Sequence, residues 1–193
     1  MTLLMPMLVA ASATPCAWLP ALQAITDTPL QIDTSNYEAM EKALRLYNGK
    51  PMLNSVNGKE DSLQHVLPLA KKYGAVLVAL CLDDSGIPAT AAGRIAVAEK
   101  IIARAAEYGI ESRNIVVDPL ALTISTGADN AAIACEIIRT MKARGINTVM
   151  GVSNISFGLP ERIYVNSAFL TMAIAKGLTM AIANPSQDLL MNA

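Results

Sequence analysis

Charged and aromatic side chains are scarce in this sequence. Of its 193 residues, 16% are charged and 4% are aromatic, whereas 53% are hydrophobic, and the formal net charge is −1. No block of Lys or Arg forms a basic stripe, which argues against nucleic acid or an anionic membrane as a partner. The composition instead predicts one globular domain with a large apolar core, whose partner is a small molecule or another protein.

Cysteine and histidine are also rare, which limits metal and redox chemistry. The three cysteines, Cys16, Cys81 and Cys135, are far apart, and none forms a CxxC pair. This odd number of isolated cysteines indicates a reducing compartment, so we expect a cytoplasmic protein without a metal site, with Cys81 and Cys135 in the core. The lone His65 falls within an expected helix, where we interpret it as a surface or packing residue.

Several sequence signatures are missing. Neither GxGxxG nor GxxxxGK[ST] occurs, which argues against dinucleotide binding and against a P-loop. The apolar first residues include an Ala-Ser-Ala stretch, but they lack the positive charges that begin a signal peptide. Pro6 and the short apolar length argue against a membrane span. We therefore expect a strand within residues 3–9, followed by a loop.

What the sequence does contain is a repeated strand, turn and helix pattern from residue 21 onward. Gly49, Gly74, Gly109 and Gly145 follow expected helices, a position where glycine is common. This alternation is typical of parallel βαβ units. The expected strands contain LQID, PMLNSV, AVLVALCL, NIVVDPL, TVMGV and TMAIANP, and the expected helices cover residues 36–47, 59–73, 90–106, 130–144 and 161–176.

Two expected helices carry specific predictions. Thr34 or Ser35 is expected to cap the helix over residues 36–47, because a side-chain oxygen there can accept from the first helical N–H groups. Thr90 opens the helix over residues 90–106, whose spacing separates an apolar face from a charged face. The apolar face comprises Ile95, Ala98, Ile101, Ile102 and Ala105, and the charged face mostly Arg94, Glu99, Lys100 and Arg104.

A polar residue lies at or just after the end of each expected strand. These residues are Asp33, Asn54, Asp83, Asp118, Asn154 and Asn184. Polar residues at every strand end favour a (β/α)8 barrel over an open doubly wound sheet, in which ligands gather at a single switch point. A complete barrel takes about 250 residues. We therefore predict a partial (β/α)8 TIM barrel that forms a single incomplete domain over residues 1–193, with these side chains in a ring around one mouth.

Asn154 lies where a strand is expected to give way to a turn. A side-chain amide both donates and accepts hydrogen bonds, which suits it to orient a ring nitrogen whose protonation changes during a reaction. Alternatively, Asn154 only caps the turn, and the same alternative applies to Asp83 and Asn184. Arg162 either contacts a substrate tail or a partner protein, or is simply solvated.

Six motifs share one resemblance. IDTS, NSVNG, LDDSGIP, VVDPL, STG and GVSNISFGLPER, in this order and spacing, resemble the pterin-binding methyltransferases. That group contains the methyltetrahydrofolate:corrinoid protein methyltransferases and the folate module of cobalamin-dependent methionine synthase, with dihydropteroate synthase as a more distant relative. The resemblance covers about residues 18–193 and implies a pterin-binding barrel of the dihydropteroate synthase type.

The resemblance implies a role for the ring residues. A carboxylate accepts from a ring N–H and an exocyclic amine together, which suits the edge of a pterin. Asn154 would be the catalytic residue at N5, because its amide oxygen would bind the proton there more strongly as the methyl group leaves. The implied pterin-binding residues are Asp33, Asn54, Asp83, Asp118, Asn154 and Asn184.

The resemblance leaves three interpretations of function. The leading one is transfer of the N5 methyl group of methyltetrahydrofolate, as substrate, to the cobalt of a corrinoid (cobalamin) that a partner protein carries. We also expect a homodimer. A dihydropteroate synthase-like activity is disfavoured, because that chemistry binds a pyrophosphate and few Lys or Arg lie near the strand ends. The third interpretation is a catalytically inactive fragment with only a binding or assembly role.

Residues 1–20 depart from the family pattern. A strand close to Asp-x-Asn-Ala-Gly is expected there, and the sequence does not contain it. We interpret the chain as truncated at both ends and residues 1–20 as anomalous. A frameshift or a misassigned start before about residue 20 is expected in the coding DNA, and sequencing of the locus checks it.

Overall fold

A parallel β-sheet organises the molecule. The structure, a computed structural model, describes residues 3–4, 7–9 and 18–192. Within these residues the strand order is β1-β8-β7-β6-β5-β4-β3-β2, and every pairing is parallel. The predicted partial barrel is confirmed, because each strand from β3 to β8 lies beside the next one along the chain. The main strands are β3 (Gln31–Asp33), β4 (Met52–Asn57), β5 (Val76–Leu80), β6 (Ile115–Asp118), β7 (Asn147–Gly151) and β8 (Met180–Ile182).

The amino-terminal residues pair with both edges of these six strands. β1 (Leu3–Leu4) pairs with β8, and β2 (Met7–Val9) pairs with β3. The strand expected within residues 3–9 is therefore present as two short strands. Cys16 lies outside the described residues, and the expected frameshift stays a prediction.

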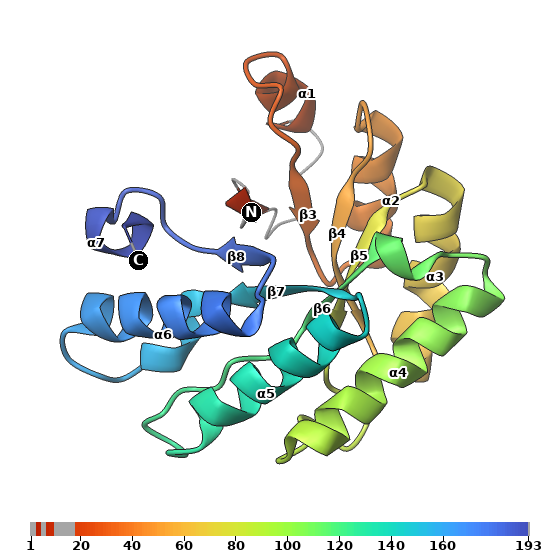
Figure 1. The fold of residues 1–193 in the computed structure, drawn as a ribbon. Coiled ribbons are helices and arrows are strands. Elements are labelled where there is room, and N and C mark those ends of the chain that lie inside the picture. Colours follow the sequence, from red (N-terminus) through yellow and green to blue (C-terminus); the bar gives the residue numbers. More distant parts are fainter. Residues whose placement is uncertain (1–2, 5–6, 10–17, 193) are drawn as a thin grey trace.

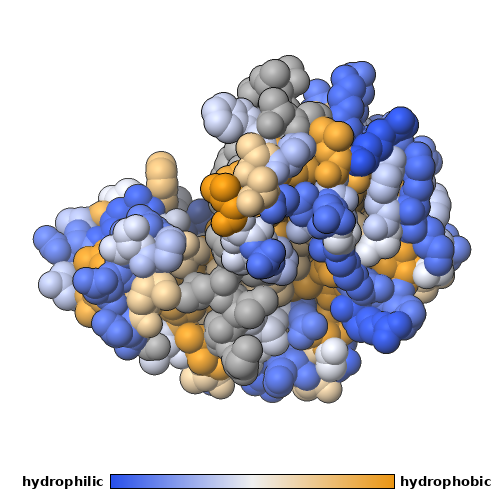
Figure 2. All heavy atoms as spheres, turned by 90° about the horizontal axis from the view of Figure 1, so that it is seen from above, coloured by the Kyte–Doolittle hydropathy of each residue, from blue (hydrophilic) through white to orange (hydrophobic). Residues whose placement is uncertain are grey.

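Helices alternate with the strands and lie on the outer side of the curved sheet (Figure 1). Hydrophilic side chains cover most of the face seen in Figure 2, with hydrophobic ones scattered between them. No helix among the described residues is long and apolar enough to cross a membrane. The helices are α1 (Trp18–Gln23), α2 (Tyr37–Leu46), α3 (Glu60–Tyr73), α4 (Ala91–Glu107), α5 (Asn130–Ala143), α6 (Arg162–Lys176) and α7 (Asp188–Met191).

The predicted cap of α2 is wrong by one or two residues. Asn36 is the cap, and its Oδ1 accepts from the backbone N–H of Ala39 at 2.9 Å. The Thr34 hydroxyl instead accepts from the Asn36 N–H at 3.1 Å, so it orders the turn that leads into the helix. The competing cap signals lay too close together for the sequence to separate them.

The two faces of the sheet pack into different apolar clusters, one toward the helices and one toward the barrel interior. Ile32, Leu53, Leu77 and Ile115 join the large core between sheet and helices. Successive side chains of a strand point to opposite faces, so the intervening residues face inward. The inward layer consists of Met52, Val78, Val116 and Val149, with Val76, Leu80, Met180 and Ile182 packed against it.

The two cysteines within the described residues are buried free thiols, as predicted. His65 is half exposed on α3, where its Nδ1 lies 2.8 Å from the Asp61 carbonyl oxygen. Its ring stacks on Tyr37 with centroids 4.6 Å apart. The interpretation of His65 as a surface and packing residue is therefore confirmed.

Candidate functional site

The predicted polar ring lies at one edge of the sheet. β3 to β8 are parallel neighbours, so their carboxyl ends share that edge. Asp33 and Asp118 end β3 and β6, Asn54 lies within β4 in register with Asp33, and the segments after β5, β7 and β8 contain Asp83, Asn154 and Asn184. The structure thus brings the ring positions to one mouth, although the side chains differ in what they contact.

Asp33 and Asn54 form a bonded pair. The two residues are in register on β3 and β4, and Asn54 Nδ2 donates to Asp33 Oδ2 at 3.1 Å. Both line a cavity of about 230 Å³. Partial burial raises the pKa of the Asp33 carboxyl. The pair therefore offers a carboxylate and an amide side by side to a ligand with several N–H groups.

Asp118 is the most enclosed member of the ring. It ends β6 with 8% of its surface exposed, and it is in register with Leu80, which lines the same cavity as Asp33. Its Oδ1 accepts from the backbone N–H of Leu120 at 2.8 Å. Burial raises the pKa of this carboxyl to about 6, and the Leu120 N–H offsets only part of that effect. A strongly shifted carboxyl at a strand end is typical of a functional site.

Arg94 supports the Asp118 loop, and sequence reasoning placed it wrongly. The helical pattern assigned it to the charged face of α4, but only 1% of its surface is exposed. Its Nη1 donates to the carbonyls of Pro119 and Leu120 at 3.0 and 2.8 Å, and its Nε donates to the Pro88 carbonyl at 2.8 Å. The guanidinium therefore ties the loop after β5 to the loop after β6. The sequence offered one indication of this burial, because Arg94 is a polar residue at the edge of the apolar face of its helix.

Asp83 and Asn184 are bonded within their own turns. Asp83 Oδ1 accepts from the backbone N–H and the hydroxyl of Ser85 at 2.9 and 2.6 Å, and these bonds lower the pKa of its carboxyl. Asn184 Oδ1 accepts from the Ser186 N–H at 3.0 Å. Each side chain thus has the turn-forming contact that was the alternative to ligand binding, and its pterin role stays a prediction.

Asn154 lies in a short 3-10 helix directly after β7, over Val152–Ser156. Its amide nitrogen lies 3.2 Å from where a Cβ on Gly151 would be, so the missing side chain at Gly151 leaves room for the amide. Its side chain is exposed and has no hydrogen-bond partner among the residues that the structure describes. The Asn154 amide is therefore available to a ligand.

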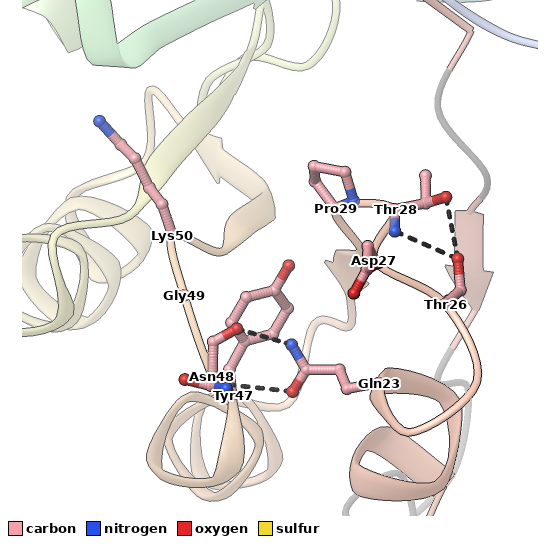
Figure 3. Close-up of a pocket in the computed structure, with 9 residues that line it drawn as sticks. All are labelled: Gln23, Thr26, Asp27, Thr28, Pro29, Tyr47, Asn48, Gly49 and Lys50. Carbon is pink, nitrogen blue, oxygen red and sulfur yellow. Dashed lines mark hydrogen bonds between the residues drawn. The ribbon is translucent and has the colours of Figure 1, made fainter.

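Two further cavities adjoin the barrel. One of about 290 Å³ lies beside Asn184 and Arg162. The other, of about 280 Å³, lies among α1 and the loops before β3 and β4, at the opposite edge from the ring (Figure 3). The Gln23 side chain donates to the backbone carbonyl of Asn48 at 2.7 Å and accepts from the backbone N–H of Asn48 at 3.0 Å. These four groups are therefore already hydrogen-bonded. Within the described residues, no three His, Cys, Asp or Glu side chains gather where they could hold a metal ion.

The raised pKa of Asp118 predicts a cost in stability. Burial moves this pKa from its ordinary 3.8 to about 6, so the folded protein keeps a proton that the unfolded chain releases between these values. Stability should therefore fall as pH rises through this window, and the charged form costs about 3 kcal/mol above it. Asp118→Asn is expected to increase the free energy of unfolding at pH 7.5 by about 2 kcal/mol, because the uncharged amide avoids most of that cost.

Urea unfolding of both proteins at pH 4 and pH 7.5 measures this difference. The increase in the free energy of unfolding of Asp118→Asn should be absent at pH 4, where the wild-type carboxyl is protonated. An equal gain at both pH values would show that charge burial is not its cause.

Comparisons with known proteins agree with this fold. A family model described as "Pterin binding enzyme" matches residues 16–184. The chain is 33% identical over 178 residues to methionine synthase of Mycobacterium tuberculosis, covering 85% of this chain but 15% of that protein. It is 29% identical over 177 residues to methylcorrinoid:tetrahydrofolate methyltransferase of Eubacterium limosum, covering 89% of this chain and 65% of that one.

Structural similarity extends to more distant proteins. Dihydropteroate synthase of Stenotrophomonas maltophilia matches with a TM-score of 0.74 at 14% identity, covering 99% of this chain and 89% of that one. At this identity the match establishes the fold alone. Since the family model matches most of the chain, this chain belongs to the pterin-binding enzyme family.

Proposed function

We propose that this chain transfers a methyl group between N5 of methyltetrahydrofolate and the cobalt of a corrinoid carried by a partner protein. The observation that carries the proposal is the arrangement at one mouth of the barrel. The bonded Asp33–Asn54 pair lies on the neighbouring strands β3 and β4, and the buried Asp118 ends β6, which is separated from β4 by β5. The names of two relatives, methionine synthase and methylcorrinoid:tetrahydrofolate methyltransferase, support a methyl transfer rather than another pterin reaction.

The residues have separate roles in this reaction. Asp33, Asn54 and Asp118 hold the pterin edge, since carboxylates accept from its N–H groups and the amide supplies both a donor and an acceptor. Asn154 accepts from the proton that N5 takes up, and it stabilises the positive charge that this proton places on the leaving nitrogen before the methyl group departs. Such a hydrogen bond strengthens in the transition state and therefore accelerates the reaction. The corrinoid, when bound, supplies the nucleophilic metal.

The direction of transfer does not change these roles. The Eubacterium limosum relative is named for transfer from methylcorrinoid to tetrahydrofolate. Forward and reverse transfer pass through the same transition state, so one set of side chains serves both. The expected homodimer stays a prediction beside this proposal.

Calorimetric titration of the purified chain with methyltetrahydrofolate tests the proposal. We expect a dissociation constant of about 1–100 μM, in the range of typical substrate affinities. The Asp33→Ala variant should bind at least about tenfold more weakly, because it loses charge-assisted hydrogen bonds. Asp27→Ala, which changes an exposed carboxylate in the loop before β3, at the opposite edge of the sheet from the mouth, is the control.

Two results would contradict the proposal. The absence of binding would indicate an inactive pocket. Tighter binding of a pterin pyrophosphate than of methyltetrahydrofolate would favour the dihydropteroate synthase-like alternative.

A further inference from the structure

An aromatic side chain lines the cavity of about 230 Å³ that contains Asp33 and Asn54. This side chain is Tyr37, the first residue of α2, which follows the cap residue of that helix. Of the described residues that line the cavity, only Tyr37 has an aromatic ring. The cavity therefore combines a flat apolar surface with a carboxylate and an amide.

Residues of α3 hold the Tyr37 ring in place. The Tyr37 hydroxyl donates to Asp61 Oδ2 at 2.8 Å, and the ring stacks on His65 with the ring centroids 4.6 Å apart and the planes 4° from parallel. The His65 Nδ1 lies 2.8 Å from the Asp61 carbonyl oxygen. A carbonyl oxygen can only accept, so this nitrogen carries a proton and donates. Asp61 thus holds both rings, one through its carboxylate and the other through its main chain.

The same contacts keep the Tyr37 ring uncharged. Burial raises the pKa of the Tyr37 hydroxyl, and the Asp61 carboxylate raises it further. The hydroxyl therefore stays protonated and remains a donor to Asp61. A ring that is neutral and already fixed loses little conformational freedom when a ligand packs against it.

The stack with His65 indicates which side of the Tyr37 ring faces the cavity. His65 is not among the residues that line the cavity, so its imidazole covers the side of the Tyr37 ring that lies away from it. Among the residues that the structure describes, no second aromatic ring stacks on Tyr37. The other face of the ring is therefore available to a flat ligand, since aromatic rings favour offset-stacked arrangements.

We propose that the pterin ring of methyltetrahydrofolate stacks on Tyr37. His65 is then the outer layer of a stack of three rings, and Asp61 and His65 are positioning residues. The inference rests on the proposed function and adds an aromatic wall to the polar contacts of the site. Asp33 and Asn54 bind the edge of the pterin and fix its orientation in its own plane. A stacked ring binds the face of the ligand, so it favours flat heterocycles over other donors and acceptors of similar polarity.

Calorimetric titration with methyltetrahydrofolate compares variants that keep or lose the aromatic ring. Tyr37→Leu should raise the dissociation constant about tenfold, as expected when a ring that stacks on a heterocycle is removed. Tyr37→Phe keeps the ring and should bind within about threefold of the wild type. His65→Leu removes only the outer ring, so it should weaken binding by about threefold. Tyr108→Leu is the matched control, because Tyr108 is also partly buried but lies at the end of α4, at the opposite edge of the sheet.

Absorbance of the bound folate separates stacking from mere packing. Stacked rings absorb less near-ultraviolet light than separate rings, so saturation with the wild-type chain should lower the absorbance of methyltetrahydrofolate. Tyr37→Phe and Tyr108→Leu should lower it equally at saturation. Tyr37→Leu should lower it less, which a purely structural role of Tyr37 would not produce.

Three outcomes would count against the inference. Equal affinities of the wild type and Tyr37→Leu would overturn it and leave the proposed function intact. A loss of affinity in Tyr37→Leu with an unchanged decrease in absorbance, or an equal loss in Tyr108→Leu, would mark the effect as structural and overturn it as well. Absence of binding by the wild-type chain would instead refute the proposed function, and the stack with it.

Discussion

Replacing Asn154 by alanine is expected to lower kcat for methyl transfer by about 10²- to 10³-fold, the loss typical of removing one transition-state hydrogen bond. Binding of methyltetrahydrofolate should change by less than about threefold, because the contact strengthens only as N5 becomes positive. The structure supports a large effect on kcat with a small effect on binding. The Asn154 side chain has no partner among the described residues, so its removal leaves no buried group unpaired.

Methyl transfer to free Co(I) cobalamin, followed by its visible absorbance, gives kcat, and calorimetry gives the dissociation constant. Asn147→Ala, an exposed asparagine at the other end of β7, is the control. A loss of binding as large as the loss of kcat would show that Asn154 only holds the substrate.

A second variant moves the Asn154 amide without removing it. A Cβ at Gly151 would lie 3.2 Å from the Asn154 nitrogen, which is tighter than an ordinary contact. Gly151 has a φ of −73°, so alanine is compatible with its backbone. Gly151→Ala should therefore give a kcat between those of the wild type and Asn154→Ala. Unchanged kcat would mean that the amide position is not critical.

The order of elements was readable from the sequence because local rules and topology agree. Gly74 ends α3 in the left-handed conformation, and Thr90 caps α4 through its hydroxyl, both at the predicted positions. Once the strands are parallel and consecutive, their carboxyl ends must share an edge. The placement of Asp33, Asp118 and Asn154 at one mouth therefore followed without any knowledge of contacts between them.

Side-chain partners could not be predicted in the same way. Helical periodicity assigns a face but not a depth, so it placed Arg94 on the charged face, although Arg94 reaches carbonyls 25 and 26 residues away. Asn166 gave no signal either, since an asparagine within a helix is ordinary. Its unpaired oxygen became visible only when the packing around α6 was known. Long-range contacts of this kind depend on tertiary geometry.

The second large effect is expected from Arg94→Met. The variant keeps the apolar stem but removes the donors from three carbonyls, those of Pro88, Pro119 and Leu120. Each buried carbonyl left without its donor costs about 1–3 kcal/mol, so the free energy of unfolding in urea should fall by about 3–5 kcal/mol. Leu120 has a φ of 56°, a conformation unfavourable for leucine, and the Arg94 contact to its carbonyl helps to hold it.

Arg94→Met should also affect the candidate binding site, because the Leu120 N–H that donates to the Asp118 carboxylate belongs to the same loop. Arg94→Met is therefore expected to weaken binding of methyltetrahydrofolate at a temperature where the variant is still folded. Arg139→Met, at an exposed position on α5, should change neither quantity. If Arg94→Met lowered stability but left the affinity intact, Asp118 would not depend on the arginine for its position. If it lowered neither, other donors would satisfy the three carbonyls, and the network around Arg94 would not stabilise the fold.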